Sequence, residues 1–219
     1  MKYRILSKPS YSLLELQLEN EEVIAETGAM VYMKNVELKT EMKGGLLGGL
    51  KRTLLGGESF FINRFYSKGE GLLGLAPPYS GDVVHIPISG RIYAQSGAFL
   101  ASNPEIEIDT KWGGAKTFFS GEGLFLLKLE GNGDVFLSSF GGVEKIELKN
   151  ESLIVDTGHI VAFDDNLEFK VKKVGGLKST ILSGEGLVAE FTGEGNVWIQ
   201  TRSISSYIGW LSSLIPKRD

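Results

Sequence analysis

One pattern occurs three times in this chain, and it constrains the fold more than any other feature of the sequence. The copies align on a Thr-Gly or Ser-Gly pair at Gly28, Gly97 and Gly158. An apolar run ending in one acidic or amide residue precedes each pair, and a second apolar run follows it, as in VIAETGAMVYM, IYAQSGAFLA and LIVDTGHIVAF. The same order of blocks in three successive stretches indicates that the chain is assembled from copies of one structural unit.

Each copy continues with a glycine-rich block and then with two apolar segments around a polar one. The blocks are GGLKRTLLGGES, GGAKTFFSGEG and GGLKSTILSGEG, which start at Gly48, Gly113 and Gly175. Runs of Val, Ile, Leu, Phe and Thr that are broken by Gly and Asn are typical of short strands joined by tight turns. The segment GNGD at Gly131 predicts a hairpin turn, because Asn-Gly tolerates positive φ at both central positions.

These observations predict an all-β protein in which related repeats form one domain. We expect a single β domain over residues 1–202, with three repeats at about 15–83, 84–143 and 144–202. A short amphipathic helix and a tail are expected over residues 203–219.

The helix prediction rests on the segment RSISSYIGWLSSLIPKRD, in which apolar residues recur three and four positions apart. Ser203 can cap the start of the helix, and Pro216 ends it. Ile208, Trp210 and Leu211 lie on or beside the apolar stripe. Such a stripe usually covers the core of its own protein, which is the favoured interpretation here. The alternative is that these residues form an interface with a partner or a second copy.

The segment KGGLLGGLKRTLLGGES, which starts at Lys43, resembles a phosphate-binding loop at first sight. Such a loop needs Gly, four residues and then Gly-Lys-Ser/Thr, but Leu50 stands where the lysine is required. Leu46 and Leu47 occur only in the first copy and, with Leu50, lie next to cationic residues. Apolar residues beside cations can mark a loop that contacts a membrane surface or a partner. The alternative, which we favour, is that these leucines fold back onto the core.

The sequence offers little material for a metal site or for nucleophilic catalysis. The chain has no cysteine, and its two histidines, His85 and His159, lie far apart without a His-x-His motif. A site that combines them with Asp156 or Glu26 is the most that can be assembled. No Gly-x-Ser-x-Gly elbow is present either. We therefore expect no metal, no cofactor and no catalytic residue, which predicts that the protein is not an enzyme.

The glycine-rich blocks repeat one glutamate and one upstream lysine in step. Three carboxylates brought together by the repeats would attract a cation, whereas solvated turns that carry surface ion pairs are the simpler interpretation. The residues concerned are Glu58, Glu122 and Glu185, with Lys51, Lys116 and Lys178.

Charge and hydropathy exclude several other classes of protein. A net charge of −4 and a pI near 5.4 argue against a nucleic-acid-binding protein, which usually carries a basic face. No apolar run reaches the length of a membrane span, and the N-terminal segment lacks the pattern of a signal peptide. A cytoplasmic protein is the expectation.

The ordered motifs ETGAMVYM, GGLLGGLKRTLLGGESFF and GEGLLGLAP resemble the bacterial and archaeal relatives of the altered-inheritance-of-mitochondria family. The resemblance covers the chain from about Glu15 to Arg202. It implies a fold of the double-stranded β-helix type, similar to the tryptophan RNA-binding attenuation protein, and it supplies no catalytic residue. Mitochondrial members are linked to inner-membrane organisation, but the segment after Met1 has no presequence pattern, so that location is not expected here. Fold similarity alone does not imply RNA binding either.

The function expected from the sequence is a non-enzymatic β scaffold that forms a homo-oligomer or binds a protein partner. The alternative is a small-ligand or sugar-binding module whose pocket contains aromatic residues such as Tyr32, Tyr93 or Trp112. Peripheral membrane contact is a further alternative. Neither a nucleic acid nor a cofactor is an expected partner.

Overall fold

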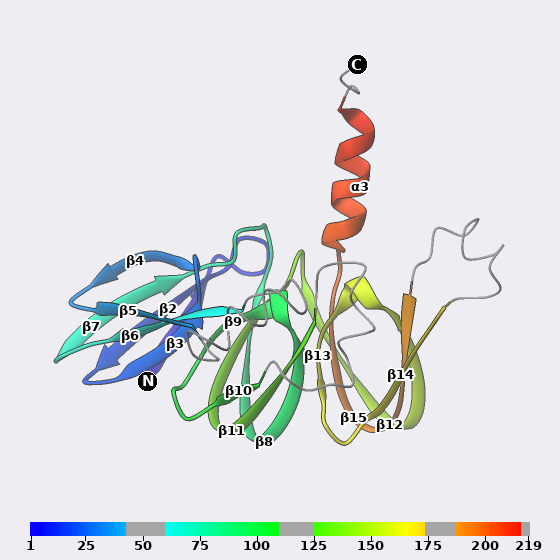
Figure 1. Ribbon diagram of the computed structural model, residues 1–219, viewed down its shortest axis with the longest axis horizontal. Coiled ribbons are helices and arrows are strands. Elements are labelled where there is room, and N and C mark those ends of the chain that lie inside the picture. Colours follow the sequence, from blue (N-terminus) through cyan, green and yellow to red (C-terminus); the bar gives the residue numbers. More distant parts are fainter. Residues whose placement is uncertain (43–59, 110–124, 174–186, 216–219) are drawn as a thin grey trace.

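The structure is a computed structural model that describes residues 1–42, 60–109, 125–173 and 187–215. Strands dominate it, and one α-helix follows them at the C-terminal end of the described chain (Figure 1). The first elements are β1 (Lys2–Leu6), β2 (Leu13–Glu19), β3 (Glu22–Glu26), β4 (Met30–Lys34), β5 (Glu37–Met42), β6 (Phe61–Tyr66) and β7 (Glu70–Leu75). The next are β8 (Val83–Gln95), η1 (Ser96–Ala98), β9 (Phe99–Ser102), β10 (Glu107–Asp109) and β11 (Leu126–Ser138). The last are β12 (Val143–Asp156), η2 (Thr157–His159), β13 (Ile160–Asp164), β14 (Glu168–Lys173), β15 (Leu187–Gln200) and α3 (Ile204–Leu214).

The described strands form two antiparallel sheets. The smaller sheet has the order β1-β2-β7-β4, and the larger has the order β12-β15-β13-β8-β11-β9-β3-β6-β5, with β10 attached to β11 and β14 attached to β15. Figure 1 shows the strands from β2 to β7, those from β8 to β11 and those from β12 to β15 following one another across the molecule. The all-β prediction is confirmed, whereas the double-stranded β-helix, its three repeats and the likeness to the attenuation protein stay predictions.

Long antiparallel pairs form the frame of the larger sheet. Strand β8 pairs with β11 along its whole length, and β12 pairs with β15 in the same way. In the first part of the chain, β2 with β7 and β3 with β6 make the corresponding pairs. These strands are interrupted where Asn20 and Gly69 both adopt positive φ, and the side-chain Oδ1 of Asn20 accepts from the Gly69 amide at 2.9 Å. The first pair of strands therefore contributes to both sheets.

The polar segment at Gly131 does not form the predicted hairpin turn. Strand β11 runs through it without reversing, and β15 likewise runs through Gly193 in the related segment TGEGN. Both glycines have positive φ, +149° at Gly131 and +122° at Gly193. An added Cβ at Gly131 would lie 2.7 Å from the carbonyl oxygen of Glu105. The glycines thus bend a continuous strand against a neighbouring segment, so this turn prediction is wrong.

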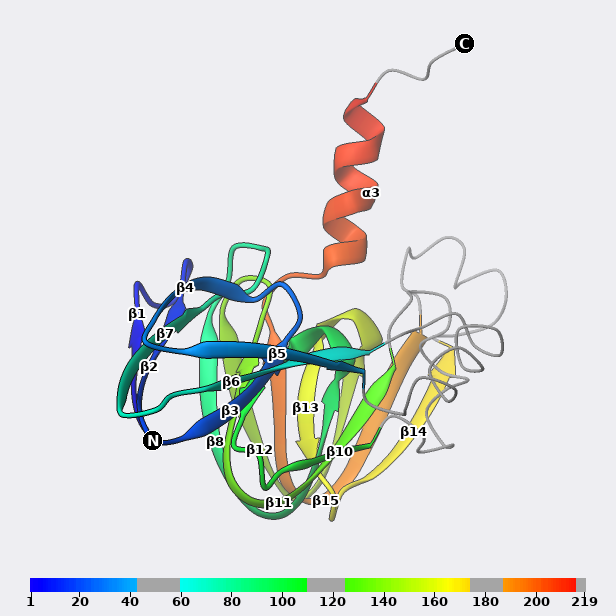
Figure 2. The same ribbon diagram turned by 60° about the vertical axis from the view of Figure 1, so that its left-hand side comes forward.

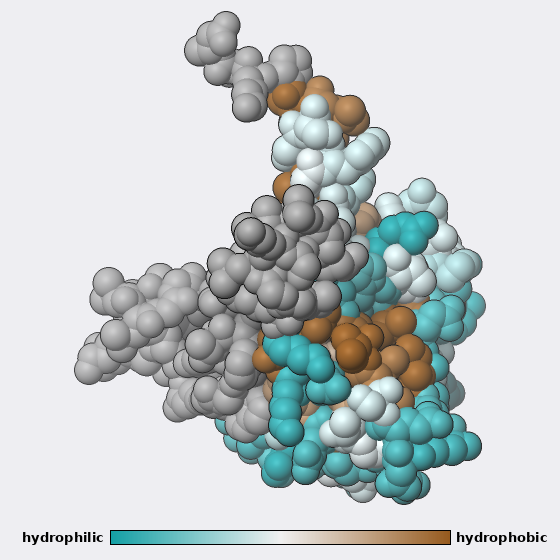
Figure 3. All heavy atoms as spheres, turned by 90° about the vertical axis from the view of Figure 1, so that its right-hand side faces the viewer, coloured by the Kyte–Doolittle hydropathy of each residue, from teal (hydrophilic) through white to brown (hydrophobic). Residues whose placement is uncertain are grey.

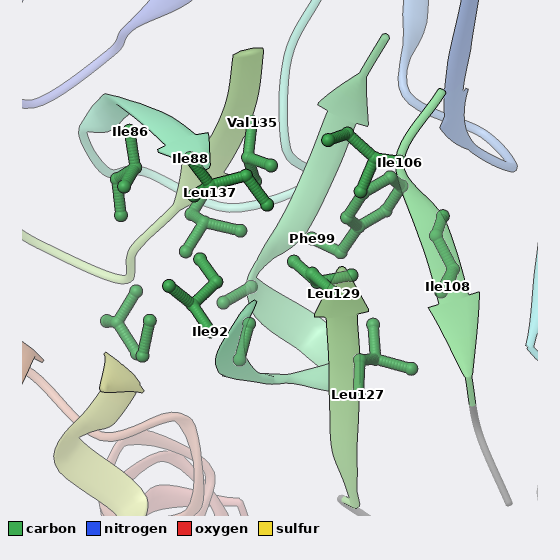
Figure 4. Close-up of a cluster of buried hydrophobic side chains, with 14 of the residues drawn as sticks. Ile86, Ile88, Ile92, Phe99, Ile106, Ile108, Leu127, Leu129, Val135 and Leu137 are labelled. Atoms are coloured by element: carbon green, nitrogen blue, oxygen red, sulfur yellow. The ribbon is translucent and has the colours of Figure 1, made fainter. Parts of the chain in front are cut away.

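The buried side chains form hydrophobic clusters along the molecule. One cluster packs between β2, β3, β6 and β7, and another packs between β12, β13 and β15. The cluster between them draws its side chains from β8, β9, β10 and β11, together with neighbouring strands, as Figure 4 shows. Its labelled members are Ile86, Ile88, Ile92, Phe99, Ile106, Ile108, Leu127, Leu129, Val135 and Leu137. The core therefore extends through successive strand pairs rather than around a single centre.

The C-terminal helix is confirmed, but the favoured interpretation of its apolar stripe is wrong. The hydroxyl of Ser203 caps α3 by accepting from the amide of Ser206 at 3.4 Å. No residue of α3 is buried, and the helix projects away from the sheets in both ribbon views (Figures 1 and 2). The ring of Tyr207 lies 5.4 Å from the ring of Phe140, at the base of the helix. The stripe therefore does not cover the β core.

Several predictions fall outside the described residues. They concern Leu46, Leu47 and Leu50, the repeated residues Glu58, Glu122 and Glu185 with Lys51, Lys116 and Lys178, and Trp112. Within the described part of the chain, no helix has the length and hydrophobicity needed to span a bilayer.

Candidate interaction surface

Two junctions inside the chain join successive groups of strands in the same way. At the first, β3 pairs with β9 and places Ala25 opposite Ala101. At the second, β8 pairs with β13 and places Ala94 opposite Ala162. In both cases one alanine lies three residues before the aligned glycine of its own copy and the other lies four residues after its own. We call these two antiparallel contacts the inner joints.

The next residue pair repeats the correspondence. Ile24 lies opposite Ser102 at one inner joint, and Tyr93 lies opposite Phe163 at the other. These residues are four before and five after the aligned glycines. The inner joints therefore share one register as well as one strand direction.

Strand β4 follows its aligned glycine as β9 and β13 follow theirs. Unlike β9 and β13, it pairs with only one described strand. Counted from the aligned glycines, β4 pairs with β7 at the positions where β9 pairs with β11 and β13 pairs with β15. All three pairings also contain a register shift at the same place, which in β4 lies between Met30 and Tyr32. However, β4 is the last strand of its sheet within the described chain. Among the described strands, none pairs with its outer side, which we call an open edge.

Strand β12 has the position of β3 and β8, and it too ends its sheet. Its described strand partner is β15, and no described strand lies on the other side. Ile154 and Val155 are the residues that correspond to the paired positions of β3 and β8. We call β4 and residues 153–155 of β12 the two outer edges.

Burial differs sharply between most residues of the outer edges and their counterparts, whereas Val155 of β12 is buried as its counterparts are. In β4, Met30 is 40% exposed, Val31 53% and Met33 44%. Their counterparts in β9 and β13 are at most 1% exposed. These counterparts are Phe99, Leu100 and Ser102 in β9 and Ile160, Val161 and Phe163 in β13. In β12, Ile154 is 55% exposed, although its counterparts Ile24 and Tyr93 are buried. Figure 3, which faces the end of the molecule that carries β12, β14 and β15, shows apolar residues bordered by hydrophilic ones.

The combination of unpaired edges and exposed apolar side chains has a physical consequence. An open strand edge presents unpaired backbone N–H and C=O groups that can pair with another strand. Exposed apolar side chains on the same strand add a favourable burial term to such pairing. The outer edges are therefore suited to bind another strand, and they differ from the other terminal strands, β1 and β5, in having paired counterparts at the inner joints.

Helix α3 provides a second exposed apolar surface. Its larger apolar residues, Tyr207, Ile208, Trp210, Leu211 and Leu214, are all exposed. On a helical projection they lie on one side, and the serines and the glycine of α3 lie on the other. A hollow of about 470 Å³ at the base of the helix is lined by Phe140, His159, Thr201, Arg202, Ser203, Ser206, Tyr207 and Trp210. Of the predicted interaction residues, Ile208, Trp210 and Leu211 are thus accessible.

The two histidines are held by different neighbours in separate parts of the fold. The imidazole of His85 bridges Tyr3 and Asp134, with Nδ1 at 2.8 Å from the phenol oxygen and Nε2 at 2.7 Å from the carboxylate. The Nδ1 of His159 lies 2.7 Å from the carbonyl oxygen of Gln200. Among the described residues, no group of His, Asp and Glu side chains has the arrangement of a metal site. The fold therefore does not bring the two histidines together.

The acidic residues that precede the aligned glycines serve different roles. Asp156 accepts from the amide of Gly158 at 2.9 Å and so caps the short helix η2. Glu26 is half-buried, and burial raises the pKa of its carboxyl group to about 7. Tyr79 is a neighbour whose hydroxyl donates to the carbonyl oxygen of Gly97 at 2.6 Å. Glu26 is therefore the described acid whose charge depends on pH near neutrality.

The aromatic residues proposed for a sugar pocket do not gather in one place. The ring of Tyr93 packs 5.3 Å from that of Phe163 in a buried cluster. The hydroxyl of Tyr32 donates to Glu15 at 2.6 Å on the smaller sheet. A hollow of about 500 Å³ beside β8 contains neither of them, and its lining includes Trp198, Arg91 and Asp164. The fold therefore places Tyr32 and Tyr93 in different parts of the described chain, and the ligand-binding alternative stays a prediction.

The outer edges were not predicted from the sequence, although the presence of three aligned copies could have indicated them. The segment MVYM of β4 is as apolar as the aligned FLAS and IVAF, so hydrophobicity alone predicts equal burial. If the three aligned sequence copies fold as a row of similar units, one side is left without a neighbour at each end of the row. That reasoning would have identified β4 and β12 as exposed.

Comparisons with known proteins give a consistent result over the length of the chain. A family model described as mitochondrial biogenesis AIM24 matches residues 3–202. An uncharacterized protein of Streptococcus pyogenes serotype M6 is 32% identical over 227 aligned residues, which cover 99% of this chain and 92% of that protein. The crystal structure of a protein from Streptococcus pyogenes matches with a TM-score of 0.79 and 31% identity, covering 98% of this chain and 99% of that one.

Proposed function

This chain belongs to the mitochondrial biogenesis AIM24 family, and from that premise we propose that it is a non-enzymatic β scaffold that associates with copies of itself. The observation that carries the proposal is the exposure of β4 and Ile154 at positions whose counterparts are buried. Association with another copy would cover these apolar side chains and pair the open strand edges.

We also propose that the chain consists of three copies of one unit of the double-stranded β-helix type. The common order of strand pairing supports this view, since β9 with β11, β13 with β15 and β4 with β7 share one register. In a row of such units, each inner face is covered by the next unit and the end faces are not. A scaffold role follows naturally, because the repeated residues then serve strand pairing rather than chemistry.

The proposal that the protein is not an enzyme is supported by the roles of its polar residues. His85 is held between Tyr3 and Asp134, and Asp156 caps η2. These side chains are thus engaged in contacts that stabilise local structure. A cytoplasmic location remains part of the proposal. So does the absence of a nucleic-acid partner, which the acidic composition supports.

A sedimentation-velocity series over a range of protein concentrations tests the self-association. We expect the unmodified chain to form species heavier than one copy. Val31→Lys places a charge on the outer edge and should return the protein to single copies, because charged side chains block edge pairing. Leu38→Lys is the matched control, since Leu38 is exposed on the edge strand β5 but occupies no joint position. A single-copy protein at every concentration would overturn the proposal.

A second candidate function, contact with a membrane surface, is favoured by the exposed amphipathic face of α3. Trp210 and Tyr207 carry amphipathic rings that suit a membrane–water interface, and the polar side of the helix consists of serine and glycine without a charge. The protein should then cosediment with phosphatidylcholine vesicles, and Ile208→Glu should abolish this binding while Ser205→Glu on the polar side should not. If the unmodified chain and both variants all stay in the supernatant, membrane contact is rejected.

A further inference from the structure

The inner joints specify how one copy of the chain can bind the next. We infer that β4 of one copy pairs antiparallel with β12 of a second copy, with Tyr32 opposite Val155 and Met33 opposite Ile154. This inference rests on the proposed self-association and adds its partner strands, direction and register.

The register follows from counting along the aligned copies. Both inner joints pair the residue three before one aligned glycine with the residue four after another. The residue four after Gly28 is Tyr32, and the residue three before Gly158 is Val155. These positions lie on the two outer edges, so the missing third joint has one defined register.

The side chains at the outer edges suit this register. At the inner joints the paired residues are alanines. The alanine that follows the aligned glycine lies opposite a large ring on its other neighbouring strand, Phe136 in β11 for Ala101 and Trp198 in β15 for Ala162. In β4 the sizes are exchanged, because Tyr32 lies opposite Gly74 of β7. An added Cβ at Gly74 would lie 2.5 Å from the ring of Tyr32, so this ring occupies the space over the glycine.

The position of the tyrosine ring leaves the joint accessible. The hydroxyl of Tyr32 donates to Glu15 at 2.6 Å, and Glu15 also accepts from Nε of Arg4 at 3.0 Å. These contacts hold the ring against β7 and β2, within its own sheet. The ring of Tyr32 therefore leaves its outer side free for a strand that carries Val155.

Charge is complementary along the same register. Extending the pairing by one residue places Lys34 opposite Leu153, and Glu151 is then the diagonal neighbour of Lys34. Diagonal neighbours in an antiparallel pair are within reach of long side chains. Both Lys34 and Glu151 are exposed in the single chain. A one-residue slip would move all side chains of β4 to the opposite face, so the register is well defined.

The inferred contact is heterologous, because β4 and β12 are different surfaces at opposite ends of the molecule (Figure 1). Each copy that uses its β4 edge still presents a β12 edge to a further copy. Head-to-tail contacts of this kind generate closed rings or continuing filaments, in contrast to a two-fold dimer. The chain should therefore bind a second copy through unlike edges.

Disulfide cross-linking tests this arrangement directly, because the chain has no cysteine of its own. Met33→Cys and Ile154→Cys variants are prepared separately, mixed and oxidised, and the products are separated by denaturing electrophoresis without reductant. Directly opposite residues in an antiparallel pair lie within the distance that a disulfide spans. We expect a shift from the single-chain to the double-chain band in the mixture and not in either variant alone.

A mixture of Leu38→Cys with Ile154→Cys is the matched control and should stay as single chains. Double-chain bands from Met33→Cys alone would indicate a two-fold contact and would overturn the inference. Sedimentation of the unmodified chain as a larger species without cross-linking in the mixture would reject this register while leaving the proposed self-association intact. A chain that never sediments as more than one copy would reject both.

Discussion

The inner joints and the outer edges occupy equivalent positions relative to the aligned glycines. Side chains at these positions are buried at the inner joints and mostly exposed at the outer edges. Phe163 of β13 is buried at an inner joint, whereas Met33, its counterpart in β4, is almost half exposed. Ile24 and Ile154 differ in the same way. Burial of these side chains therefore depends on whether a second strand lies beside them, because the local strand and its register are alike.

The largest expected difference concerns folding stability at an inner joint. The ring of Phe163 lies 4.9–5.3 Å from those of Tyr93, Phe169 and Phe191. Phe163→Ala should therefore lower the free energy of unfolding by about 3–5 kcal/mol, because it removes a buried ring and leaves a cavity. Met33→Ala should change that free energy by less than about 0.5 kcal/mol in the single chain.

Urea unfolding measured at a concentration where single copies prevail checks this contrast. Both variants are compared with the unmodified chain, and the midpoint and the slope are reported separately. Similar losses of stability in the two variants would mean that β4 is already covered in the single chain. That result would remove the distinction between joint and edge.

The residue two positions before each aligned glycine differs in charge among the three copies. Glu26 occupies the position held by Gln95 and Asp156 in the other two copies, and burial raises the pKa of Glu26 from 4.5 to about 7. Since the folded chain then binds this proton more tightly than the unfolded chain, its contribution to stability is complete below about pH 4.5 and is lost as the pH rises to about 7.

Glu26→Gln removes this pH-dependent loss. The difference in unfolding free energy between the variant and the unmodified chain should shift in favour of the variant by up to about 2.5 kcal/mol between pH 5 and pH 8, and by less to the extent that solvent screens the half-buried carboxyl group. Guanidinium unfolding at the two pH values measures the shift. An unchanged difference between the variant and the unmodified chain at both values would show that the carboxyl group of Glu26 is solvated.

The smallest expected effect concerns α3, which is exposed without being an outer edge. Removal of residues 204–219 should change the unfolding free energy of the β strands by less than about 0.5 kcal/mol, because no residue of α3 is buried. The truncated chain should form the same number of copies per particle as the full chain in sedimentation velocity, after allowance for its smaller mass. Loss of the larger species on truncation would move the interface from the outer edges to the helix.

The sequence predicted the helix and the all-β class because both depend on local patterns. Ser203 and the apolar spacing after it define the start of α3, and the apolar segments define the strands. The same patterns do not reveal what a surface contacts. The stripe of α3 was therefore assigned to the core, although Ile208 and Trp210 are exposed.

The error at Gly131 has a related cause. Glycine with positive φ serves a reversing turn and a bent strand equally well, and only the neighbouring segment distinguishes the two. In the structure, Glu105 approaches the glycine closely and β11 continues. At the interaction surface, Ile154 and Tyr93 are both apolar and have aligned positions, so their different burial depends on whether a second strand lies beside them and not on residue type.

Complementation between two edge variants tests directly whether β4 of one copy binds β12 of another. Val31→Lys disables β4 and keeps β12, whereas Ile154→Lys disables β12 and keeps β4. Each variant alone should sediment as a single copy, and an equimolar mixture should form a one-to-one dimer that grows no further, because one intact edge of each kind remains. A mixture that stays as single copies, while the unmodified chain forms larger species, would contradict the head-to-tail contact of β4 with β12.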